Sequence, residues 1–366
     1  MIELSVSVPG GSYPIHIQSG LFPQVGERVE GMHRGRHGLV IFDDKVRPLH
    51  GESLMDGFSS SWNMQAVDFQ ALEANKRMET VSRLLNDCLA AGLDRGGLVL
   101  AVGGGITGDV AGFTAASYMR GIALIQIPTT LLAMVDASVG GKTGVNLPLP
   151  GGEGTGKNLA GAFWQPSGVL MDPMVLETLD PRDLRCGLGE CIKHAMIADP
   201  SMLDLIESEK EGILAADPDC LERLIHRAVE IKIAVIEEDE REHGARASLN
   251  LGHTFAHAIE PIADLDLRHG EAVAIGLVAA ASCAQELGMI EPARVQRMRS
   301  VIEQVGLPTS LSSSIPVDRL IQAMRFDKKV HDGQLRLVLP GPDGVTIHDD
   351  IPMDAVQRAW QVVGAV

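Results

Sequence analysis

Apolar and polar positions follow one rhythm in the first half of the chain. Short runs of Val, Ile and Leu recur there between glycine and proline residues, and segments with helical spacing separate some of them. The runs occupy 39–42, 98–102, 123–127 and 168–171, and one such helical segment is 75–91. Strands that alternate with helices predict a mostly parallel sheet with both faces covered.

The rhythm changes near residue 180. From there helical periodicity dominates, and Pro and Gly stand mainly between the periodic segments. We predict helices over 181–197, 201–215, 218–238, 247–262, 270–287, 291–305 and 316–326, and a short strand over 334–339. The sequence therefore predicts two domains, an α/β domain over 1–180 and a helical domain over 181–366.

Composition excludes several classes of protein. With 31 Lys+Arg against 48 Asp+Glu, the net charge is −17, so phosphate backbones would repel the chain and nucleic acid is not expected as a partner. The five cysteines are odd in number and none forms a CxxC pair, which disfavours a disulfide framework and fits a reducing cytoplasm. No signal peptide or membrane-spanning segment is visible, so we expect no membrane association.

A glycine turn at 98–116 predicts nucleotide binding. Gly103, Gly105 and Gly108 satisfy G-x-G-x-x-G between an expected strand and an expected helix, where backbone and helix N-terminus attract a pyrophosphate. A tight turn without a ligand is the alternative. The acid expected about 20 residues further on is absent. Asp43 ends an earlier strand instead, so we expect the nucleotide in a different topological arrangement.

Two other glycine stretches imitate a P-loop and fail its context. The first ends in Lys142, but its leading glycine would fall on Asp136; the second ends in Lys157, but Asn158 replaces the residue that binds magnesium. A P-loop ATPase is therefore not expected. Both lysines remain candidates for contact with an anion, although solvated lysines would explain the spacing as well.

Histidines gather in the helical half. His253 and His257 share a helix face, and His269 follows shortly after. Thr254 stands where a zinc protease has glutamate, so that class is disfavoured, and Glu190 is the candidate carboxylate. Two further polar residues lie near the cluster, Asn250 and Glu271. The combination favours a metal site over ordinary core or surface histidines.

Basic residues are scarce, so those near the motifs carry information. Cationic groups that face one cavity would suit a substrate with phosphate and carboxylate groups, although each residue alone is more simply explained as surface charge. The candidates are Arg120, Lys193, Lys232, Arg246, Lys328 and Lys329.

Together the motifs resemble those of the 3-dehydroquinate synthase family, which acts in the shikimate pathway. The matching segments are GGGITGDVAGFTAASYMRG, IPTTLLAMVDASVGGKTGVN, GKNLAGAFWQP, GLGECIKH, EREHGARASLNLGHTFAHAIE, LRHGEAV and DKKV. They extend from about residue 73 to 330, and the combination is far more specific than any single glycine loop.

The resemblance implies a dehydroquinate synthase-like fold, with an α/β Rossmann-like NAD-binding N-terminal domain plus an all-α C-terminal metal-binding domain. It implies an active site between the domains, and a homodimer. The metal, zinc or cobalt, would be held by Glu190, His253 and His269. His257 would then be an active-site residue rather than a ligand.

The resemblance assigns two further sets of residues. NAD would contact Asp43, Glu73, Lys76, Gly104, Gly105, Ile106, Thr107, Gly108, Asp109, Thr129, Thr130, Lys142, Lys157 and Thr178. The substrate cavity would be lined by Asp136, Lys142, Asn158, Lys193, Lys232, Glu242, Arg246, Asn250, His257 and Lys328. Arg120 resembles the arginine that reaches the substrate phosphate of the neighbouring subunit.

The implied reaction converts 3-deoxy-D-arabino-heptulosonate 7-phosphate to 3-dehydroquinate and phosphate. NAD transiently oxidises C5, which acidifies the C6 proton and allows phosphate to leave. Re-reduction, ring opening and an intramolecular aldol reaction then close the carbocycle. The enzyme would be a lyase without net redox change, and positioning of one conformer would be much of its task.

Three other functions compete with this reading. A metal-dependent polyol dehydrogenase related to glycerol dehydrogenase would share NAD and the metal, but would not need the cationic set. A sister cyclase would act on another sugar phosphate, and Lys232, Arg246 and His257 favour the shikimate substrate. A non-catalytic NAD-binding protein would leave buried charges without a ligand, which is costly.

The chain departs from the family pattern at three places. Ala256 stands where glycine is frequent, and His194 stands where an aromatic residue is frequent. The segment 147–156 contains an insertion next to Lys157 and Asn158. None of these departures removes an expected metal ligand.

Overall fold

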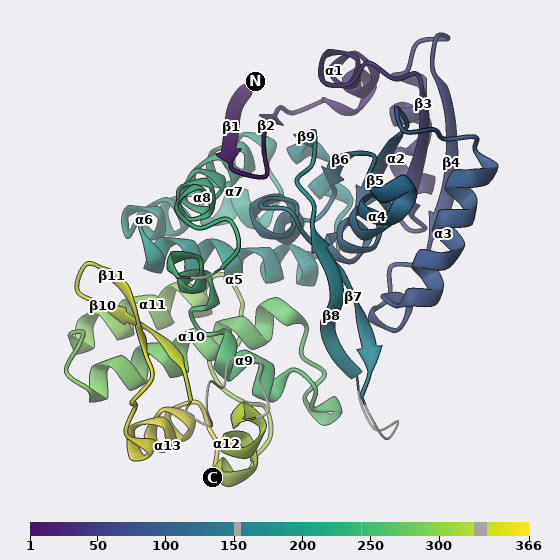
Figure 1. Cartoon of the computed structure of the whole chain (residues 1–366). Coiled ribbons are helices and arrows are strands. Elements are labelled where there is room, and N and C mark those ends of the chain that lie inside the picture. Colours follow the sequence, from purple (N-terminus) through teal and green to yellow (C-terminus); the bar gives the residue numbers. More distant parts are fainter. Residues whose placement is uncertain (150–154, 243, 326–334) are drawn as a thin grey trace. The chain divides into compact units, whose positions relative to one another are not determined.

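The computed structural model describes residues 1–149, 155–242, 244–325 and 335–366. They form two compact units, Met1–Leu179 with Ala216–Glu240 and Asp180–Ala215 with Arg241–Val366 (Figure 1). Among the described residues, no helix combines the length and the apolar character that a membrane span requires.

A seven-stranded sheet in the order β1-β2-β9-β6-β5-β3-β4 is the centre of the first unit. All neighbouring strands are parallel except β1 and β2, which form an antiparallel hairpin. The strands are β1 (Ile2–Val8), β2 (Gly11–Ile17), β3 (His37–Asp43), β4 (Asn63–Phe69), β5 (Leu98–Gly103), β6 (Ala123–Pro128) and β9 (Gly168–Met171). The four strands expected from the apolar runs are confirmed as β3, β5, β6 and β9.

Helices cover this sheet because its central strands are apolar on both faces. Every residue of β5 is buried, as a parallel strand between two helical layers requires. On one face, α3 and α4 pack their apolar sides on β3 and β5. The helices of the unit are α1 (Val25–Met32), α2 (Arg47–Asp56), α3 (Met78–Ala90), α4 (Gly105–Ser117) and α8 (Pro218–Glu238).

A second, two-stranded sheet follows β6 in the chain. It pairs β7 (Lys142–Pro148) with β8 (Thr155–Phe163) in antiparallel fashion. In the expected insertion at 147–156, Leu147 pairs with Gly156 and Pro148 pairs with Thr155, and residues 150–154 lie outside the described part of the chain. Lys142 and Lys157 lie on β7 and β8, so neither lysine begins the helix that a P-loop requires, which confirms the exclusion of a P-loop.

The placement of α8 corrects the expected domain division. Its residues were assigned to the helical domain, but the helix packs with β1 and with the turn at Ala133–Ala137 in the first unit. Backbone amides of Ser7 and Gly10 donate to Glu237 and Glu240 at its end, at 2.7 and 3.0 Å. Helical periodicity gives the buried face of α8 but not the partner on which that face packs.

The described residues of the second unit are helical apart from one hairpin. Its helices are α5 (Pro181–Ile197), α6 (Ser201–Ser208), α7 (Lys210–Leu214), α9 (His253–Ile259), α10 (His269–Glu286), α11 (Pro292–Gln304), α12 (Val317–Arg325) and α13 (Met353–Val362). The hairpin pairs β10 (Leu337–Gly341) with β11 (Gly344–His348). The expected strand at 334–339 corresponds to β10, and the expected helix at 247–262 begins only at His253, after a 3₁₀ turn at Ala245–Asn250.

Helix α10 forms the core of the second unit. It is rich in alanine and buried almost all round, and it packs against α5, α9, α11 and α13. Small side chains allow close approach of these helices, and the paired rings of Phe255 and Trp360 fill the space beside them. This packing positions the first residues of α9 and α10, both of which are histidines.

Candidate functional site

The first unit contains the glycine turn between β5 and α4 at a reversal in strand order. The chain leaves β3 toward β4 on one side and returns to β5 on the other, and ligands bind at the carboxyl ends of strands at such points. Asp43 ends β3, and a Cβ added to Gly103 at the end of β5 would lie 2.9 Å from the Cβ of Asp43. Asp43 therefore lies beside the glycine turn because its strand β3 is the neighbour of β5 in the sheet.

The glycines of this turn are required by close contacts. A Cβ on Gly103 would lie 2.6 Å from Oγ1 of Thr107, and one on Gly108 would lie 2.8 Å from Oε1 of Gln126 on β6. Two buried hydroxyls at the turn, of Thr107 and Thr129, have no hydrogen-bond partner among the described residues. A backbone cradle, orphan hydroxyls and the N-terminus of α4 fit a dinucleotide pyrophosphate.

Two more of the expected NAD residues lie beside this turn. Nζ of buried Lys76 is 2.5 Å from Oδ2 of Asp109 on α4. Gly104 approaches Thr130, since an added Cβ would lie 3.2 Å from the Thr130 methyl group. The expected contacts Ile106, Thr107 and Gly108 lie on α4, whereas Thr178 accepts or donates a 2.8 Å hydrogen bond with His50.

Asn146 is a polar residue that sequence reasoning missed. It is buried at the end of β7, and its Nδ2 donates to Oε1 of Glu73 at 2.7 Å. Its Oδ1 accepts the backbone N–H of Asn158 at 2.9 Å, and Asn158 has a left-handed φ of 53°. Asn146 therefore joins one expected NAD residue to one expected substrate residue. In the sequence, Asn146 is one asparagine between Val145 and Leu147, and nothing there indicates its partners.

The three expected metal ligands come together in the second unit. Nε2 of His253 and Nε2 of His269 lie 3.6 and 3.5 Å from the same oxygen, Oε1 of Glu190. One donor atom from each residue falls within a 4.8 Å group. Donors bonded tetrahedrally to zinc lie about 3.4 Å apart, given bonds of about 2.0–2.1 Å. The spacing fits a divalent cation with two imidazoles and one carboxylate.

The other nitrogen of each imidazole is also held. Nδ1 of His253 is 3.2 Å from the carbonyl oxygen of Leu251, and Nδ1 of His269 is 3.4 Å from Oε1 of Glu260. Such partners orient metal-binding histidines and raise their basicity. Burial lowers the pKa of His269, but contacts with Glu190 and Glu260 outweigh it and raise the pKa to about 9. The potential that holds this proton also favours a metal cation.

Local backbone contacts explain how the ligands reach one place. His253 begins α9 directly after Gly252, whose φ is 76° and whose added Cβ would lie 2.9 Å from the backbone nitrogen of Leu277. His269 begins α10 directly before Gly270, whose added Cβ would lie 2.2 Å from the carbonyl oxygen of Cys186 on α5. Glycine at both positions lets the helix starts approach their neighbours.

Expected substrate residues of the first unit fall in two groups. Asp136 lies in a single π-helical turn, and Nζ of buried Lys232 on α8 contacts its backbone oxygen and lies 2.8 Å from its Oδ1. Such turns often mark functional sites. Lys142, Lys157 and Asn158 lie on the β7–β8 hairpin.

Arg120 is held by a strained turn. Both Met119 and Arg120 have left-handed backbones, with φ of 49° and 69°, which is costly for side chains of this kind. The next residue, Gly121, packs against the ring of Trp164, and the Trp164 indole donates to the carbonyl oxygen of Ile122 at 3.0 Å. The turn therefore fixes where the Arg120 backbone stands.

Expected substrate residues of the second unit lie near the metal ligands or on the segment before α9. Nζ of buried Lys193 is 2.5 Å from Oε2 of Glu190, and the His257 ring stacks edge-on with that of His253, with centroids 5.7 Å apart. Nδ2 of Asn250 donates to Oε1 of Glu242 at 2.7 Å. Two more positions complete the set: Arg246 is buried, and Lys328 lies outside the described residues.

Comparison with solved structures defines the class of protein. The fold matches 2-epi-5-epi-valiolone synthase from Streptomyces hygroscopicus subsp. jinggangensis 5008, solved with NAD+ and Zn2+, with a TM-score of 0.87, 30% identity and 98% of each chain covered. It also matches 2-deoxy-scyllo-inosose synthase complexed with carbaglucose-6-phosphate, NAD+ and Co2+, with a TM-score of 0.86, 24% identity and 100% of each chain covered. The fold is that of the sugar phosphate cyclases.

Sequence comparison then gives the family. Models described as 3-dehydroquinate synthase N-terminal and 3-dehydroquinate synthase C-terminal match residues 66–186 and 187–330. The 3-dehydroquinate synthase of Nostoc punctiforme is 38% identical over 363 residues, with 98% of each chain covered. This chain belongs to the 3-dehydroquinate synthase family.

Proposed function

We propose that this chain is an NAD- and metal-dependent lyase that converts 3-deoxy-D-arabino-heptulosonate 7-phosphate to 3-dehydroquinate and phosphate. The observation that carries the proposal is the donor set of Glu190, His253 and His269, complete and correctly spaced in a member of this family. Relatives that match over nearly the whole chain are named 3-dehydroquinate synthase.

The cofactor roles follow from the two units. Bound NAD supplies a reversible hydride acceptor, and a bound zinc or cobalt ion polarises the hydroxyl to be oxidised. The glycine turn at 103–108 and Asp43 hold the dinucleotide, with Glu73, Lys76 and Thr130 around it. Glu190, His253 and His269 hold the metal, and Glu260 fixes the ring of His269.

The substrate roles follow from buried cations. Lys193, Lys232 and Arg246 are buried, and a buried cation is costly unless anions face it. Glu190 faces Lys193, and Asp136 faces Lys232. A substrate with one carboxylate and one phosphate suits such a set, in which the cations orient both ends and hold one reactive conformer.

The cationic set also weighs against the dehydrogenase alternative. A polyol carries no anionic group, so Lys193, Lys232 and Arg246 would have no role in binding it. A sister cyclase shares the sugar phosphate, and the family relationship favours the shikimate substrate.

We also propose that the enzyme is a cytoplasmic homodimer. The β7–β8 hairpin exposes three large apolar side chains, Leu149, Leu159 and Phe163, each more than two-fifths exposed. The strained turn at Arg120 packs beside the end of this hairpin through Trp164. A second copy covering the hairpin would bury this apolar surface and bring Arg120 to its neighbour's substrate. All five cysteines are free, which suits a reducing cytoplasm.

One reaction followed in two channels tests the activity. Protein, NAD, zinc and the heptulosonate 7-phosphate are mixed, and phosphate release and NADH absorbance are recorded together. We expect phosphate without lasting NADH, because the hydride returns within each turnover, and we expect a chelator to stop the reaction. Lasting NADH would instead indicate a dehydrogenase, and silence in both channels would contradict the proposed substrate.

Asn146 provides a second test, on cofactor binding. The variant Asn146→Leu removes the donor to Glu73 and the acceptor for Asn158 while it keeps the same branched side-chain shape. A hydrogen bond to a charged group contributes about 1.5–3 kcal/mol, so we expect the NAD dissociation constant to rise roughly tenfold or more. Calorimetric titration with NAD measures the change. Unchanged NAD affinity would show that Asn146 only supports the hairpin.

A further inference from the structure

His269 stands where a helix is usually held least well. It is the first residue of α10, and helix ends fray because their backbone groups lack intrahelical partners. A shift of the helix start by one residue would turn this side chain by about 100° and remove it from Glu190. Something outside α10 must therefore fix its first turn.

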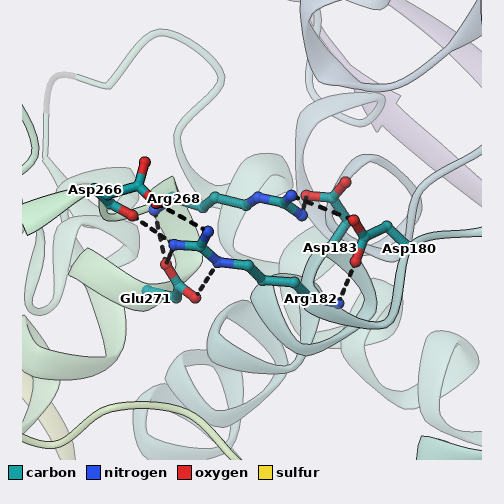
Figure 2. A network of polar contacts seen from close by, with 6 residues as sticks. All are labelled: Asp180, Arg182, Asp183, Asp266, Arg268 and Glu271. Atoms are coloured by element: carbon teal, nitrogen blue, oxygen red, sulfur yellow. Dashed lines mark hydrogen bonds and ion pairs between the residues drawn. The ribbon is translucent and has the colours of Figure 1, made fainter.

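Arg182, on the first turn of α5, supplies that restraint (Figure 2). Its Nε and Nη2 donate to Oε1 and Oε2 of Glu271 at 2.7 and 2.8 Å. The same Nη2 donates to the backbone oxygen of Asp266 at 2.5 Å, and Nη1 reaches the Asp266 carboxylate at 3.3 Å. One guanidinium thus binds the chain both before and after His269.

Glu271 connects the Arg182 side chain to the backbone at the start of α10. Its Oε2 also accepts the backbone N–H of Arg268 at 2.8 Å, in the manner of a capping box, so the carboxylate satisfies the helix start and the arginine together. The pair is only partly exposed, at 34% for Arg182 and 13% for Glu271. Burial raises the pKa of Glu271, but Arg182 and the Arg268 amide outweigh it and lower the pKa.

A second arginine reaches from the start of α10 back to α5, and it contributes less to holding the two helices together. Arg268, the residue before α10, lies 2.7 Å from Asp183 and 3.3 Å from Asp180 at the start of α5 (Figure 2). These carboxylates are about half exposed, so their ion pairs contribute little. The two helices also touch through backbone, where Gly189 faces Gly270. Gly189 precedes one ligand and Gly270 follows another, so the joint between α5 and α10 sets the ligand spacing.

We propose that Arg182 and Glu271 are positioning residues for the metal site: their two-pronged ion pair fixes the first turn of α10 on α5, so that His269 and Glu190 keep the separation a divalent cation requires. This inference rests on the metal role in the proposed function. It assigns a task to two residues that belong neither to the metal-ligand group nor to the expected substrate residues.

The test measures metal affinity rather than activity. The dissociation constants of Zn2+ and Co2+ are determined by chelator competition for the wild type, Arg182→Gln, Arg182→Lys and Glu271→Gln. Partners of this kind change affinity by about 10–100-fold, and we expect weakening in that range for Arg182→Gln. Arg182→Lys should recover only part of it, because lysine cannot bind Glu271 and the Asp266 carbonyl in one plane. The double variant Arg182→Gln/Glu271→Gln should bind the metal no more weakly than the weaker of the two single variants, because both substitutions break the same ion pair.

Control measurements separate this role from general stability. Arg358→Gln removes another partly exposed arginine of the second unit, which pairs with Asp354 on α13 and with Glu286, the last residue of α10. Glu286 lies at the opposite end of α10 from His269, so this variant should leave the metal affinity unchanged. The Co2+ absorption spectrum should change for Arg182→Gln, since the ligand geometry changes. A lower unfolding midpoint with unchanged metal affinity and spectrum would overturn the inference, as would a wild type that binds no metal. Tight, Arg182-dependent metal binding without synthase activity would instead reject the proposed function alone.

Discussion

The variant His253→Ala should lose both turnover and bound metal while it keeps its fold. Nε2 of His253 is one of three donors that converge within a 4.8 Å group, so its loss leaves Glu190 and His269 as the remaining members of that group. A metal that polarises a reacting oxygen lowers the barrier by several kcal/mol, so we expect kcat to fall by at least about 10³-fold. Metal content after gel filtration, circular dichroism and the two-channel assay check the three parts of this expectation.

A histidine away from the site provides the comparison. His348 on β11 contacts Thr346 at 2.8 Å and has no proposed role, so His348→Ala should keep metal and activity. The His253 ring is only slightly exposed, and its removal leaves a small cavity, so a modest loss of stability is expected. A His253→Ala protein that stays metal-replete and active would overturn the ligand assignment.

Periodicity predicts the central strands and most helices of the fold but not the edges of the sheet. The buried strands β3, β5, β6 and β9 are apolar on both faces, and such runs are readable without structural data. The β1–β2 hairpin and β4 were missed because their exposed positions dilute the apolar pattern. The face of α8 was readable and its partner was not, since packing across 200 residues leaves no local signal.

The candidate site divides in the same way. His253, His257 and His269 stand close together in the sequence, and motif resemblance added Glu190 from a distant helix. The residues that orient them were invisible or ambiguous, because each works through a partner far away. Asn146 meets Glu73 across 73 positions, and Arg182 meets Glu271 across 89. Candidate metal ligands can be predicted from residue type and spacing, whereas the residues that orient them can be identified only from the fold.

The glycine at the joint between α5 and α10 should be as important as the residues that bind metal. In Gly270→Ala the new Cβ would lie 2.2 Å from the carbonyl oxygen and 2.4 Å from the Cα of Cys186, and backbone cannot rotate away as a side chain can. The two helices must therefore separate beside His269 on one side and one turn before Glu190 on the other. Overpacking of this kind costs about 1–3 kcal/mol or more.

In Gly270→Ala, metal affinity should be more sensitive to the separation of α5 and α10 than the free energy of unfolding is. Ligand distances must hold to within about 0.2 Å, so a shift of a few tenths of an ångström moves the donors outside that range, and we expect the metal affinity of Gly270→Ala to fall at least tenfold. Urea titration and chelator competition give the two quantities. Gly31→Ala is the matched control, because its new Cβ meets nothing within 4 Å on the surface of α1, and it should stabilise by about 0.4–1 kcal/mol without touching metal affinity. If Gly270→Ala bound metal as tightly as the wild type, the α5–α10 joint would not be what sets the distance between Glu190 and His269.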